Sequence, residues 1–526
     1  MTSDLYVPFT APFAANENNS WGYETTPQLF SLFAYPSGVA PITQGKVMGG
    51  TGSLNSMNYV RGNPKDFDKW ENEYNATGWK YSDVLSYFKE IENFNISDVS
   101  EEDKRYHGYG GETPVNYPGY YTNLSYVFLD ACKEADYEKI DYNGEHHTGY
   151  SRVESNTAYG VRWGPSSCFL NDTVRARSNL HIFTKSIVIR ILFEQNRTTG
   201  VIFTKDGENK TVKVKREVIL CAGAIGSPKL LMLSGIGPDH ELARHNIKRV
   251  QVLPVGQALQ DHIIFLGLVV TTTMDMIGLG NFNKSIEEYN ETRTGLLTIP
   301  GAFEALLFTS SKEDKSAETE DYPDIELELA AMFPNELIGR SPYVDPAIYE
   351  KYYKPMFGKA GFMNAVAMVQ PKSRGTVHLT STNPYERPQI NPNMLYYTED
   401  LERIVNGTLK VMKLFNTAPM KAIGAEVWNE KFPYCNQFDI WSRDYVTCFV
   451  QHTAFPGQHV CCTAPMGTHK DAVVDERLRV HGINGLRVMD ASVMPAIVSG
   501  NTYAAVLMIG AKGADMVLKD AEQARY

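Results

Sequence analysis

The sequence predicts an α/β fold, and three observations support this prediction. Residues 218–221 form a short apolar run that is followed by a turn of small residues and an apolar helical segment. Residues 486–489 form a second apolar run, which ends at Asp490. A helix is then predicted to begin at Asn501 or Thr502, either of which can act as its N-cap. Strand, turn and helix in this order are typical of a sheet that binds a ligand at the carboxyl ends of its strands.

Length and composition exclude several classes of protein. The chain has 526 residues, which is enough for two or three domains or for two interleaved domains. Its formal net charge of -11 argues against nucleic acid as a partner. No apolar window is long enough to predict a membrane span, and the first thirty residues lack the pattern of a signal peptide.

Glycosylation motifs are unusually frequent. The sequence contains ten Asn-x-Ser/Thr sequons, where this composition would give about four by chance. This enrichment favours a secreted or lumenal glycoprotein, and the alternative is an asparagine-rich sequence with accidental matches. The sequons begin at Asn18, Asn75, Asn95, Asn123, Asn171, Asn196, Asn209, Asn283, Asn290 and Asn406.

The seven cysteines show no metal-binding spacing and are too sparse for a disulfide framework. Cys435 and Cys448 could form a bridge, whereas adjacent Cys461 and Cys462 are expected to pack as small apolar residues. Glu145-His146-His147 does not fit the HExxH zinc motif, and there is no GxSxG nucleophile elbow. We therefore predict no metal site.

The first half of the chain alternates loops with short regular elements. Residues 1–40 are predicted to be rich in loops because of their prolines. Residues 45–63 form a glycine-rich loop, in which Gly49 and Gly50 permit positive φ angles and close approach of a ligand. Such a loop can also be no more than a turn. Residues 84–94 have the apolar periodicity of a packing helix.

A meander of strands is predicted over residues 180–221, beginning at 179–185 and ending in the apolar run 218–221. The final strand is expected to be buried on both faces. Ser227 and Pro228 predict the N-cap and first position of the helix that follows. Residues 261–440 mix loops and short strands with a helix near 398–416, and they are the natural candidate for a substrate-covering domain.

His459 is the candidate base. A reaction that removes a hydroxyl proton needs a base that works near neutral pH, and imidazole has this property. The alternative is a structural histidine. The helix predicted to begin near Asn501 offers free N–H groups and partial positive charge, which would stabilise a bound anion, or it is a plain capped helix.

These residues resemble the glucose-methanol-choline (GMC) family of FAD-dependent oxidoreductases, most nearly its animal glucose dehydrogenase-like branch. GKVMGGTGSLNSMNYVRGNPKDFDKW is similar to the first family signature, and GAIGSPKLLMLSGIGP (223–238) is similar to the second. Further similar blocks are VGQALQDH (255–262), QPKSRGTVHLTS (370–381) and the segment 473–515. The resemblance runs from about Trp21 to the end of the chain.

The resemblance implies an α/β FAD-binding domain interleaved with an α+β substrate-binding domain. Residues 1–260 would be the first part of the FAD domain, with inserted cap elements at about 65–165. Residues 261–474 would bind substrate, and residues 475–526 would complete the FAD domain. The implied activity is oxidation of an alcohol or sugar hydroxyl, by a dehydrogenase or oxidase whose electron acceptor is a quinone or oxygen.

The resemblance also implies roles for individual residues. His459 would act on the hydroxyl proton, and Asn501 would hydrogen-bond the substrate oxygen beside the flavin. Leu54 stands where some relatives carry a histidine bonded to the flavin, so FAD is expected to bind non-covalently. The residues implied to contact FAD are Gly49, Gly50, Thr51, Asn55, Ser56, Asn58, Val188, Ala222, Gly223, Asp490, Ala491 and Thr502.

The sequence departs from the family pattern in three places. It begins after the βαβ unit with GxGxxG, the turn that would hold the FAD pyrophosphate. The usual HPxGTCxMG reads HVCCTAPMG, with Val460 and Cys462 replacing proline and glycine, and Gln44 replaces a common arginine. An incomplete gene model and a truncated protein are both open explanations for the start. Two alternative functions follow: a flavin-free glycoprotein that keeps the fold, and a lyase with structural FAD.

Overall fold

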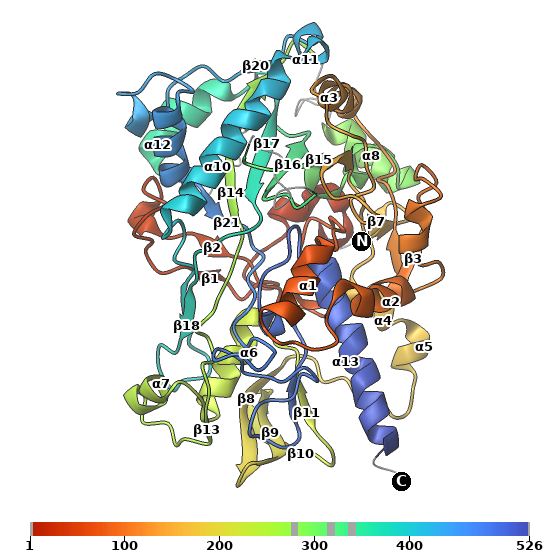
Figure 1. Cartoon of the computed structure of the whole chain (residues 1–526), viewed down its shortest axis with the longest axis vertical. Coiled ribbons are helices and arrows are strands. Elements are labelled where there is room, and N and C mark those ends of the chain that lie inside the picture. Colours follow the sequence, from red (N-terminus) through yellow and green to blue (C-terminus); the bar gives the residue numbers. More distant parts are fainter. Residues whose placement is uncertain (1–3, 275–281, 313–320, 335–342, 524–526) are drawn as a thin grey trace.

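A computed structural model describes residues 4–274, 282–312, 321–334 and 343–523. Two large clusters of buried apolar side chains organise these residues. The first cluster surrounds a parallel strand pair and two long helices, and the second fills the space around a larger antiparallel sheet. Figure 1 shows the larger sheet at one end of the molecule and the parallel pair with its meander at the other.

The larger sheet has the order β20-β14-β17-β16-β15-β5, with β21 also paired to β14. Every pairing in it is antiparallel. Helix α10 (Thr398–Val411) contacts β16 and β17, and helix α12 (Arg443–Thr453) contacts β14 (Figure 1). The strands of this larger sheet are β5 (Gly149–Arg152), β14 (Ile263–Thr271), β15 (Phe303–Thr309), β16 (Ile325–Ala330), β17 (Gly361–Met368), β20 (Glu426–Val427) and β21 (Phe455–Pro456).

The helix predicted near 398–416 is present as α10 (Thr398–Val411), continued by a 3-10 turn over Met412–Asn416. Helix α12 (Arg443–Thr453) packs beside it. Cys448 of α12 forms a disulfide with Cys435, which confirms the predicted bridge. None of the helices in the described ranges combines the length and apolar character needed to cross a bilayer.

The second region contains the predicted strand pair. Strand β11 (Val218–Leu220) runs parallel to β22 (Leu486–Val488), with Val218 opposite Leu486. The meander consists of β8 (Ser186–Glu194), β9 (Arg197–Lys205) and β10 (Glu208–Lys213) in antiparallel order. The strand predicted over 179–185 is wrong, since these residues form no regular element and 181–185 are exposed. Helix α13 (Tyr503–Gln523) begins one residue after Thr502, as predicted.

Helix α6 (Gly223–Leu233) begins at Gly223, five residues before the predicted first position, Pro228. Ser227 is not its N-cap, because its Oγ donates a hydrogen bond to Asp490 Oδ2 over 2.6 Å and accepts one from the N–H of Ala222. Pro228 therefore lies inside the helix. Proline has no N–H to offer the carbonyl of Ala224, and Thr463 Oγ1 donates to that carbonyl instead, over 2.7 Å.

Strand β11 is less buried than predicted. Leu220 is buried, but Ile219 is 40% exposed and Cys221 is also exposed. Within the described residues β11 pairs with β22 alone, so one edge of the strand has no neighbour to cover it. The expectation of a strand buried on both faces is wrong for this reason.

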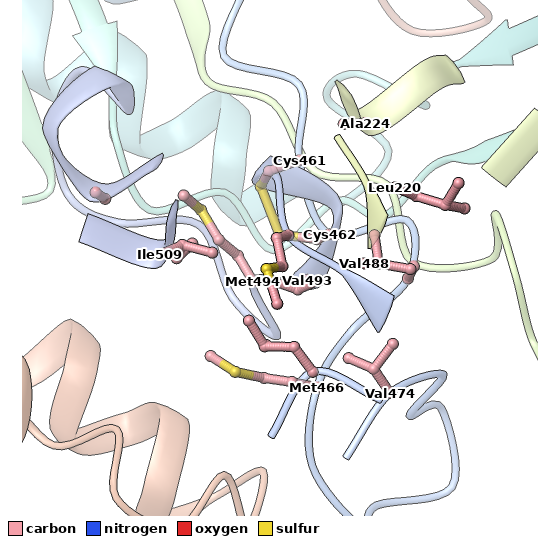
Figure 2. Packing of buried hydrophobic residues seen from close by; sticks show 14 of the residues in the cluster. Leu220, Ala224, Cys461, Cys462, Met466, Val474, Val488, Val493, Met494 and Ile509 are labelled. Carbon is pink, nitrogen blue, oxygen red and sulfur yellow. A yellow bond between two sulfur atoms is a disulfide. The ribbon is translucent and has the colours of Figure 1, made fainter. Parts of the chain in front are cut away.

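Cys461 and Cys462 are joined as an adjacent disulfide, and both are fully buried. Figure 2 shows this pair against Val493 and Met494, within the first apolar cluster. The pair is therefore packed in the core, as predicted. The disulfide bond between the two cysteines was not predicted. Cys462 has a φ angle of 71°, a left-handed conformation that suits the glycine of the family pattern better than a side chain.

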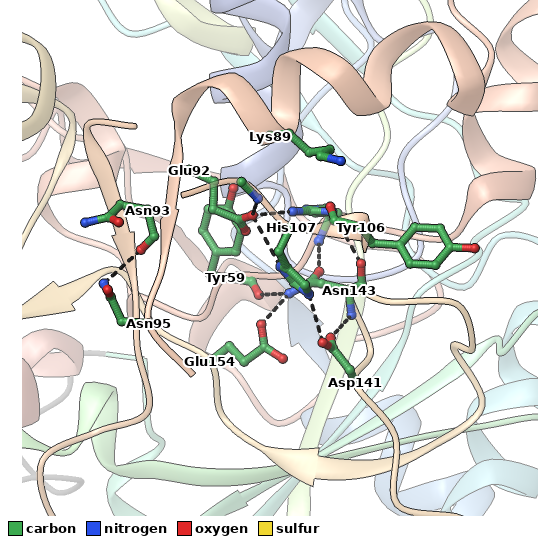
Figure 3. Close-up of polar contacts among 12 residues, drawn as sticks. Tyr59, Lys89, Glu92, Asn93, Asn95, Tyr106, His107, Asp141, Asn143 and Glu154 are labelled. Atoms are coloured by element: carbon green, nitrogen blue, oxygen red, sulfur yellow. Dashed lines mark hydrogen bonds and ion pairs between the residues drawn. The ribbon is translucent and has the colours of Figure 1, made fainter. Parts of the chain in front are cut away.

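A buried polar network supports the end of the glycine-rich loop (Figure 3). Arg61 is fully buried and donates from Nη2 to Glu92 Oε2 over 2.7 Å. His107 lies between Glu92 Oε2 at 3.2 Å and Asp141 Oδ2 at 2.8 Å. Asn143 accepts a hydrogen bond from the N–H of Arg61. Because the charges are paired and bonded, the network can remain out of water and fix the backbone around it.

Short elements complete the described chain. The predicted packing helix at 84–94 is present as α2 (Tyr81–Ile91), and residues 4–40 contain only 3-10 turns and a two-residue strand, as expected for a loop-rich segment. The other helices are α1 (Pro64–Asn72), α3 (Asn123–Glu134), α4 (Pro165–Phe169), α5 (Asp172–Arg175), α7 (Asp239–Arg244), α8 (Phe282–Thr292), α9 (Pro346–Ile348) and α11 (Ala418–Ala422). The other strands are β1 (Tyr23–Glu24), β2 (Pro41–Ile42), β3 (Glu92–Phe94), β4 (Thr113–Val115), β6 (Thr157–Ala158), β7 (Val161–Arg162), β12 (Ile236–Gly237), β13 (Gln251–Val252), β18 (Thr376–His378) and β19 (Gln389–Asn391).

Candidate active site

His459 and Asn501 lie side by side. Asn501 Nδ2 is 3.4 Å from His459 Nε2. His459 follows β21 in a turn, and its backbone N–H donates to Asp261 Oδ1 over 2.7 Å. Asn501 stands just ahead of α13, after Gly500, where an added Cβ would approach Val60 Cγ1 to 2.5 Å. Tight packing at Gly500 therefore holds Asn501 toward the imidazole.

The other ring nitrogen of His459 faces a second histidine. His262 Nδ1 lies 2.9 Å from His459 Nδ1, and His262 Nε2 lies 3.0 Å from the carbonyl oxygen of Val498. His262 is 1% exposed and directly precedes β14. Two neighbouring residues therefore position His459: Asp261 through a hydrogen bond to its backbone and His262 through a contact with its ring.

Glu328 forms the opposite wall of the site. It lies on β16, and its Oε1 accepts hydrogen bonds from Asn501 Nδ2 at 3.3 Å and from Asn58 Nδ2 at 3.1 Å. One carboxylate oxygen therefore orients the amides of both asparagines. Their Oδ1 atoms are buried and have no hydrogen-bond partner, so each offers an acceptor to a bound molecule.

Burial changes the protonation of these groups. Removal from water lowers the pKa of His459 to about 4, so its imidazole is neutral at pH 7 and able to accept a proton. Burial raises the pKa of Glu328 to about 7, although hydrogen bonds from Asn501 and Asn58 lower it. Burial likewise raises the pKa of Asp261 to about 7, against the lowering effect of backbone hydrogen bonds that include the one from His459. The site combines a neutral base with two weakly acidic carboxyl groups.

The glycine-rich loop packs against the start of α6. Gly49 and Gly50 have φ angles of 86° and 58°, and nothing lies within 4 Å of a Cβ added at Gly50. Thr51 Oγ1 donates to Gln44 Oε1 over 3.2 Å. The same Gln44 oxygen would lie 3.7 Å from a Cβ added at Gly223. Gln44 thus joins the loop to the turn after β11.

Asn55 and Ser56 lie farther along the same loop. Arg162 Nη1 donates to Asn55 Oδ1 over 2.7 Å, so this side chain already has a charged partner. Ser56 packs against Gly301, where an added Cβ would approach Ser56 Cβ to 2.7 Å. The loop is therefore held from several sides by protein atoms.

The residues predicted from the sheet meet at Asp490. Its Oδ2 accepts from the N–H of Gly223 at 3.0 Å and from Ser227 Oγ, while its Oδ1 accepts from both the N–H and the hydroxyl of Ser492. Both carboxylate oxygens are thus occupied by protein donors. Asp490 ties the start of α6 to the 3-10 turn that begins at Ala491, while Ala222 remains exposed beside it.

The remaining residues predicted to contact FAD are Val188 and Thr502. Val188 is 40% exposed on β8, in the meander at the far end of the molecule from β16 (Figure 1). The carbonyl of Thr502 accepts the N–H of Val506 in the first turn of α13. The structure therefore brings together His459, Asn501 and Asn58, and it places Val188 elsewhere.

Three site residues were missed from the sequence: Asp261, His262 and Glu328. Asp261 and His262 end the VGQALQDH block, which was recognised without assigning them a role. Glu328 lies in the run IELELA, where two acidic residues alternate with apolar ones. Charged side chains on one face of an otherwise apolar strand were a signal that this face is not an ordinary core.

One group in the described part of the chain that could hold a metal ion lies outside this site. His240, Glu241 and His378 come together where α7 meets β18. The carboxylate of Glu241 is buried and already accepts from the N–H of Leu379 and contacts His378 Nδ1 at 3.1 Å. These contacts explain the group as a link between α7 and β18.

Comparison with known proteins gives consistent matches. Two family profiles, both described as GMC oxidoreductase, match residues 31–264 and 371–510. The glucose dehydrogenase (FAD, quinone) of Drosophila melanogaster is 34% identical over 499 residues, which cover 94% of this chain and 77% of that protein. The oxygen-dependent choline dehydrogenase of Brucella anthropi is 33% identical over 98% of this chain and 88% of its own length.

A solved structure confirms the fold. The formate oxidase of Aspergillus oryzae, in which FAD modification was studied, superposes with a TM-score of 0.84 and 26% identity. The match covers 99% of this chain and 92% of that chain. Both the sequence matches and the architecture agree with the resemblance seen in the motifs. The chain belongs to the GMC oxidoreductase family and is an oxidoreductase of the class that acts on CH–OH groups.

Proposed function

We propose that this protein oxidises an alcohol or sugar hydroxyl with FAD, and that His459 is the base. The observation that carries the proposal is the 3.4 Å approach of Asn501 Nδ2 to His459 Nε2. A substrate oxygen placed beside both atoms would give its proton to Nε2 and accept a hydrogen bond from Nδ2. Both residues retain partial exposure, so a ligand can reach them.

The residues around the site fit the flavin end of FAD. The unpartnered Oδ1 atoms of Asn58 and Asn501 can accept from a ligand donor. Gly50 and Gly223 leave room for close approach, because a Cβ added at Gly50 would have no neighbour within 4 Å and one at Gly223 would meet only Gln44. Leu54, 5% exposed, supplies no nucleophile for a covalent link. We infer non-covalent binding by these residues.

The bound flavin supplies the acceptor for the hydride that leaves the substrate carbon. The chain supplies the proton chemistry and the positioning. His459 is neutral at pH 7 because burial lowers its pKa to about 4, and it therefore needs no prior deprotonation. Glu328 accepts a hydrogen bond from Asn501 Nδ2 and so orients this amide. The second N–H of the amide lies toward His459 Nε2 and would donate to a substrate oxygen placed there.

An anaerobic titration tests this function. The purified chain should show flavin absorbance, and a panel of primary alcohols, sugars and choline should bleach it for at least one member. Bound flavin that no alcohol bleaches would instead favour the lyase alternative.

The flavin-free alternative has one observation in its favour. Ile219 and Cys221 of the β11 segment are exposed, and β11 pairs on one edge only within the described residues. A sheet open at this edge offers FAD less enclosure. Absence of flavin absorbance after addition of excess FAD would support this alternative.

We also propose a secreted or lumenal location. Nine of the sequon asparagines are exposed, and only Asn406 is partly buried. The Cys435–Cys448 disulfide is consistent with an oxidising compartment. The electron acceptor, a quinone or oxygen, is to be identified by reoxidation of the reduced protein with each in turn.

A further inference from the structure

The contact between His262 and His459 places the proton on each ring. The carbonyl oxygen of Val498 can only accept, so His262 Nε2, 3.0 Å away, carries a hydrogen. A neutral imidazole has one N–H, which leaves His262 Nδ1 as an acceptor. The hydrogen between the two Nδ1 atoms, 2.9 Å apart, then belongs to His459. His459 Nε2 is left with its lone pair.

The remaining contact agrees with this assignment. Asn501 Nδ2 is an amide donor and lies 3.4 Å from His459 Nε2, which must therefore accept. The opposite assignment, with the hydrogen on His459 Nε2, would leave two acceptors facing each other at the paired Nδ1 atoms and two donors facing at Asn501. Only one arrangement of neutral rings satisfies all three contacts.

A charged ring is the other way to place a hydrogen between the two Nδ1 atoms. Burial lowers the pKa of His262 well below its usual range, and the neighbouring His459 lowers it further. Burial also lowers the pKa of His459 to about 4. Both rings are therefore neutral near pH 7, and the tautomers follow from their partners alone.

We propose that His262 is a positioning residue that fixes His459 in the Nδ1–H tautomer and so makes Nε2 the base that faces the substrate. This inference rests on the proposed function for the identity of the base. His262 touches no reacting atom. It acts through His459, as the residue that holds a catalytic imidazole in one tautomer and one orientation.

The backbone supports the same role. Asp261 and His262 are adjacent, and the carboxylate of Asp261 accepts the backbone N–H of His459 over 2.7 Å. The N–H of Gly457 donates to the carbonyl of His262 over 2.8 Å. The turn that carries His459 is therefore bound to the start of β14 by its backbone as well as by its ring.

The proton step is simple to write. The substrate O–H bond breaks, an N–H bond forms at His459 Nε2, and the electron pair stays on the substrate oxygen. His459 becomes an imidazolium whose Nδ1–H still donates to His262. The proton is not passed on to His262 Nδ1, because burial and the neighbouring His459 lower the pKa of His262 well below its usual range. A neutral partner stabilises the imidazolium less than a carboxylate would, so His459 can release the proton after the reaction.

Nitrogen NMR on the full chain labelled with 15N-histidine tests the inference without any turnover. The wild type should show one histidine, identified by its loss in His459→Gln, with Nδ1 protonated and Nε2 bare at pH 7. In His262→Leu the partner that fixes this tautomer is gone, and the signal should shift toward the Nε2–H form. His262→Asn places an amide oxygen near the former Nδ1 and should restore the wild-type signal.

A matched control removes an exposed histidine. His181→Asn should leave the His459 signal and the thermal unfolding midpoint unchanged. Detection of an Nε2–H on His459 in the wild type, or an unchanged His459 signal in both His262 variants, would overturn the proposal. If His262→Leu does not fold, the tautomer of His459 in the wild type and in His262→Asn still tests the proposal.

The kinetic prediction separates this proposal from the proposed function. Flavin reduction in His262→Leu should slow by about 10²-fold or more, with KM little changed, because His262 does not contact the substrate. His262→Asn should recover most of the rate. If no alcohol reduces the flavin but the NMR tautomer is as described, the proposed function fails and the positioning role of His262 stands.

Discussion

Thr463 Oγ1 donates a hydrogen bond to the carbonyl oxygen of Ala224 over 2.7 Å, although the two residues lie 239 positions apart. The carbonyl is free because Pro228, four residues later in α6, has no N–H. This contact couples the turn after His459 to helix α6, which begins at Gly223. It is one of the links through which distant parts of the chain form a single site.

The Thr463 contact predicts an energetic coupling. Thr463→Val should lower the free energy of unfolding by about 1–3 kcal/mol, because it leaves a buried carbonyl without a donor. Thr463→Ser keeps the hydroxyl and should cost much less. In a Pro228→Ala background the restored N–H can bond the carbonyl, so Thr463→Val should cost less there. Equal costs in the two backgrounds, measured by urea unfolding, would contradict the coupling.

Glu328 predicts a specific pH dependence of stability. Its pKa is about 7 in the folded chain against an ordinary value of 4.5. Between these values the folded chain holds a proton that the unfolded chain has released, so the contribution of Glu328 to stability falls as pH rises through this window. Glu328→Gln removes the ionisation. The Tm of the variant minus that of the wild type should therefore increase from pH 4.5 to pH 7.5.

The control for this measurement is Glu430→Gln, which changes an exposed carboxyl group. Its Tm difference from the wild type should stay flat over the same range. A flat difference for Glu328→Gln as well would show that Glu328 ionises at its ordinary pH.

The hydrogen bonds of Asp490 predict that a nearly isosteric substitution at this position strongly lowers the free energy of unfolding. Both carboxylate oxygens of Asp490 accept hydrogen bonds, and Asp490→Asn replaces one of them with an NH2 group, which donates. In one orientation this NH2 group would face the N–H of Gly223 and the hydroxyl of Ser227. In the other it would face the N–H and the hydroxyl of Ser492. The expected loss in unfolding free energy is about 2–4 kcal/mol. Asp206→Asn, at an exposed turn, should change it little. Similar small losses in both variants would mean that Asp490 does not hold α6.

The sequons predict a glycosylation pattern. When the chain is produced in a eukaryotic secretory host, peptide mapping should find glycans among the nine exposed sequon asparagines. Asn406 should carry none in the folded product, because it lies partly buried on α10 and its Oδ1 accepts from Arg443. A fully modified Asn406, or no glycan anywhere, would contradict this prediction.

Much of the fold could be predicted because it is local in sequence. The periodicity of α10 and the apolar runs of β11 and β22 are each visible within about ten residues. The start of α6 could not be predicted, since Ser227 is taken from its capping role by Asp490, 263 positions away. The exposure of Ile219 likewise depends on which strands stand beside β11, not on its own sequence.

The site divides in the same way. His459 and Asn501 could be predicted as a pair from the family resemblance, and the structure places them within 3.4 Å. His262 could not be given its role, because its partner is 197 residues away and the contact depends on both rings. Glu328 meets Asn501 across 173 residues. Signals of this kind exist only after distant parts of the chain have come together.

The most direct test of the central claim is the rate of flavin reduction, measured anaerobically by stopped flow, in the wild type and in His459→Gln. The wild type should be reduced by an alcohol that bleaches it in the titration. His459→Gln should bind the same flavin, but the alcohol should reduce this flavin at least about 10²-fold more slowly than in the wild type. His181→Asn, at an exposed histidine, serves as the matched control and should match the wild type. A His459→Gln rate equal to that of the wild type would contradict the account, because His459 would then not be the base.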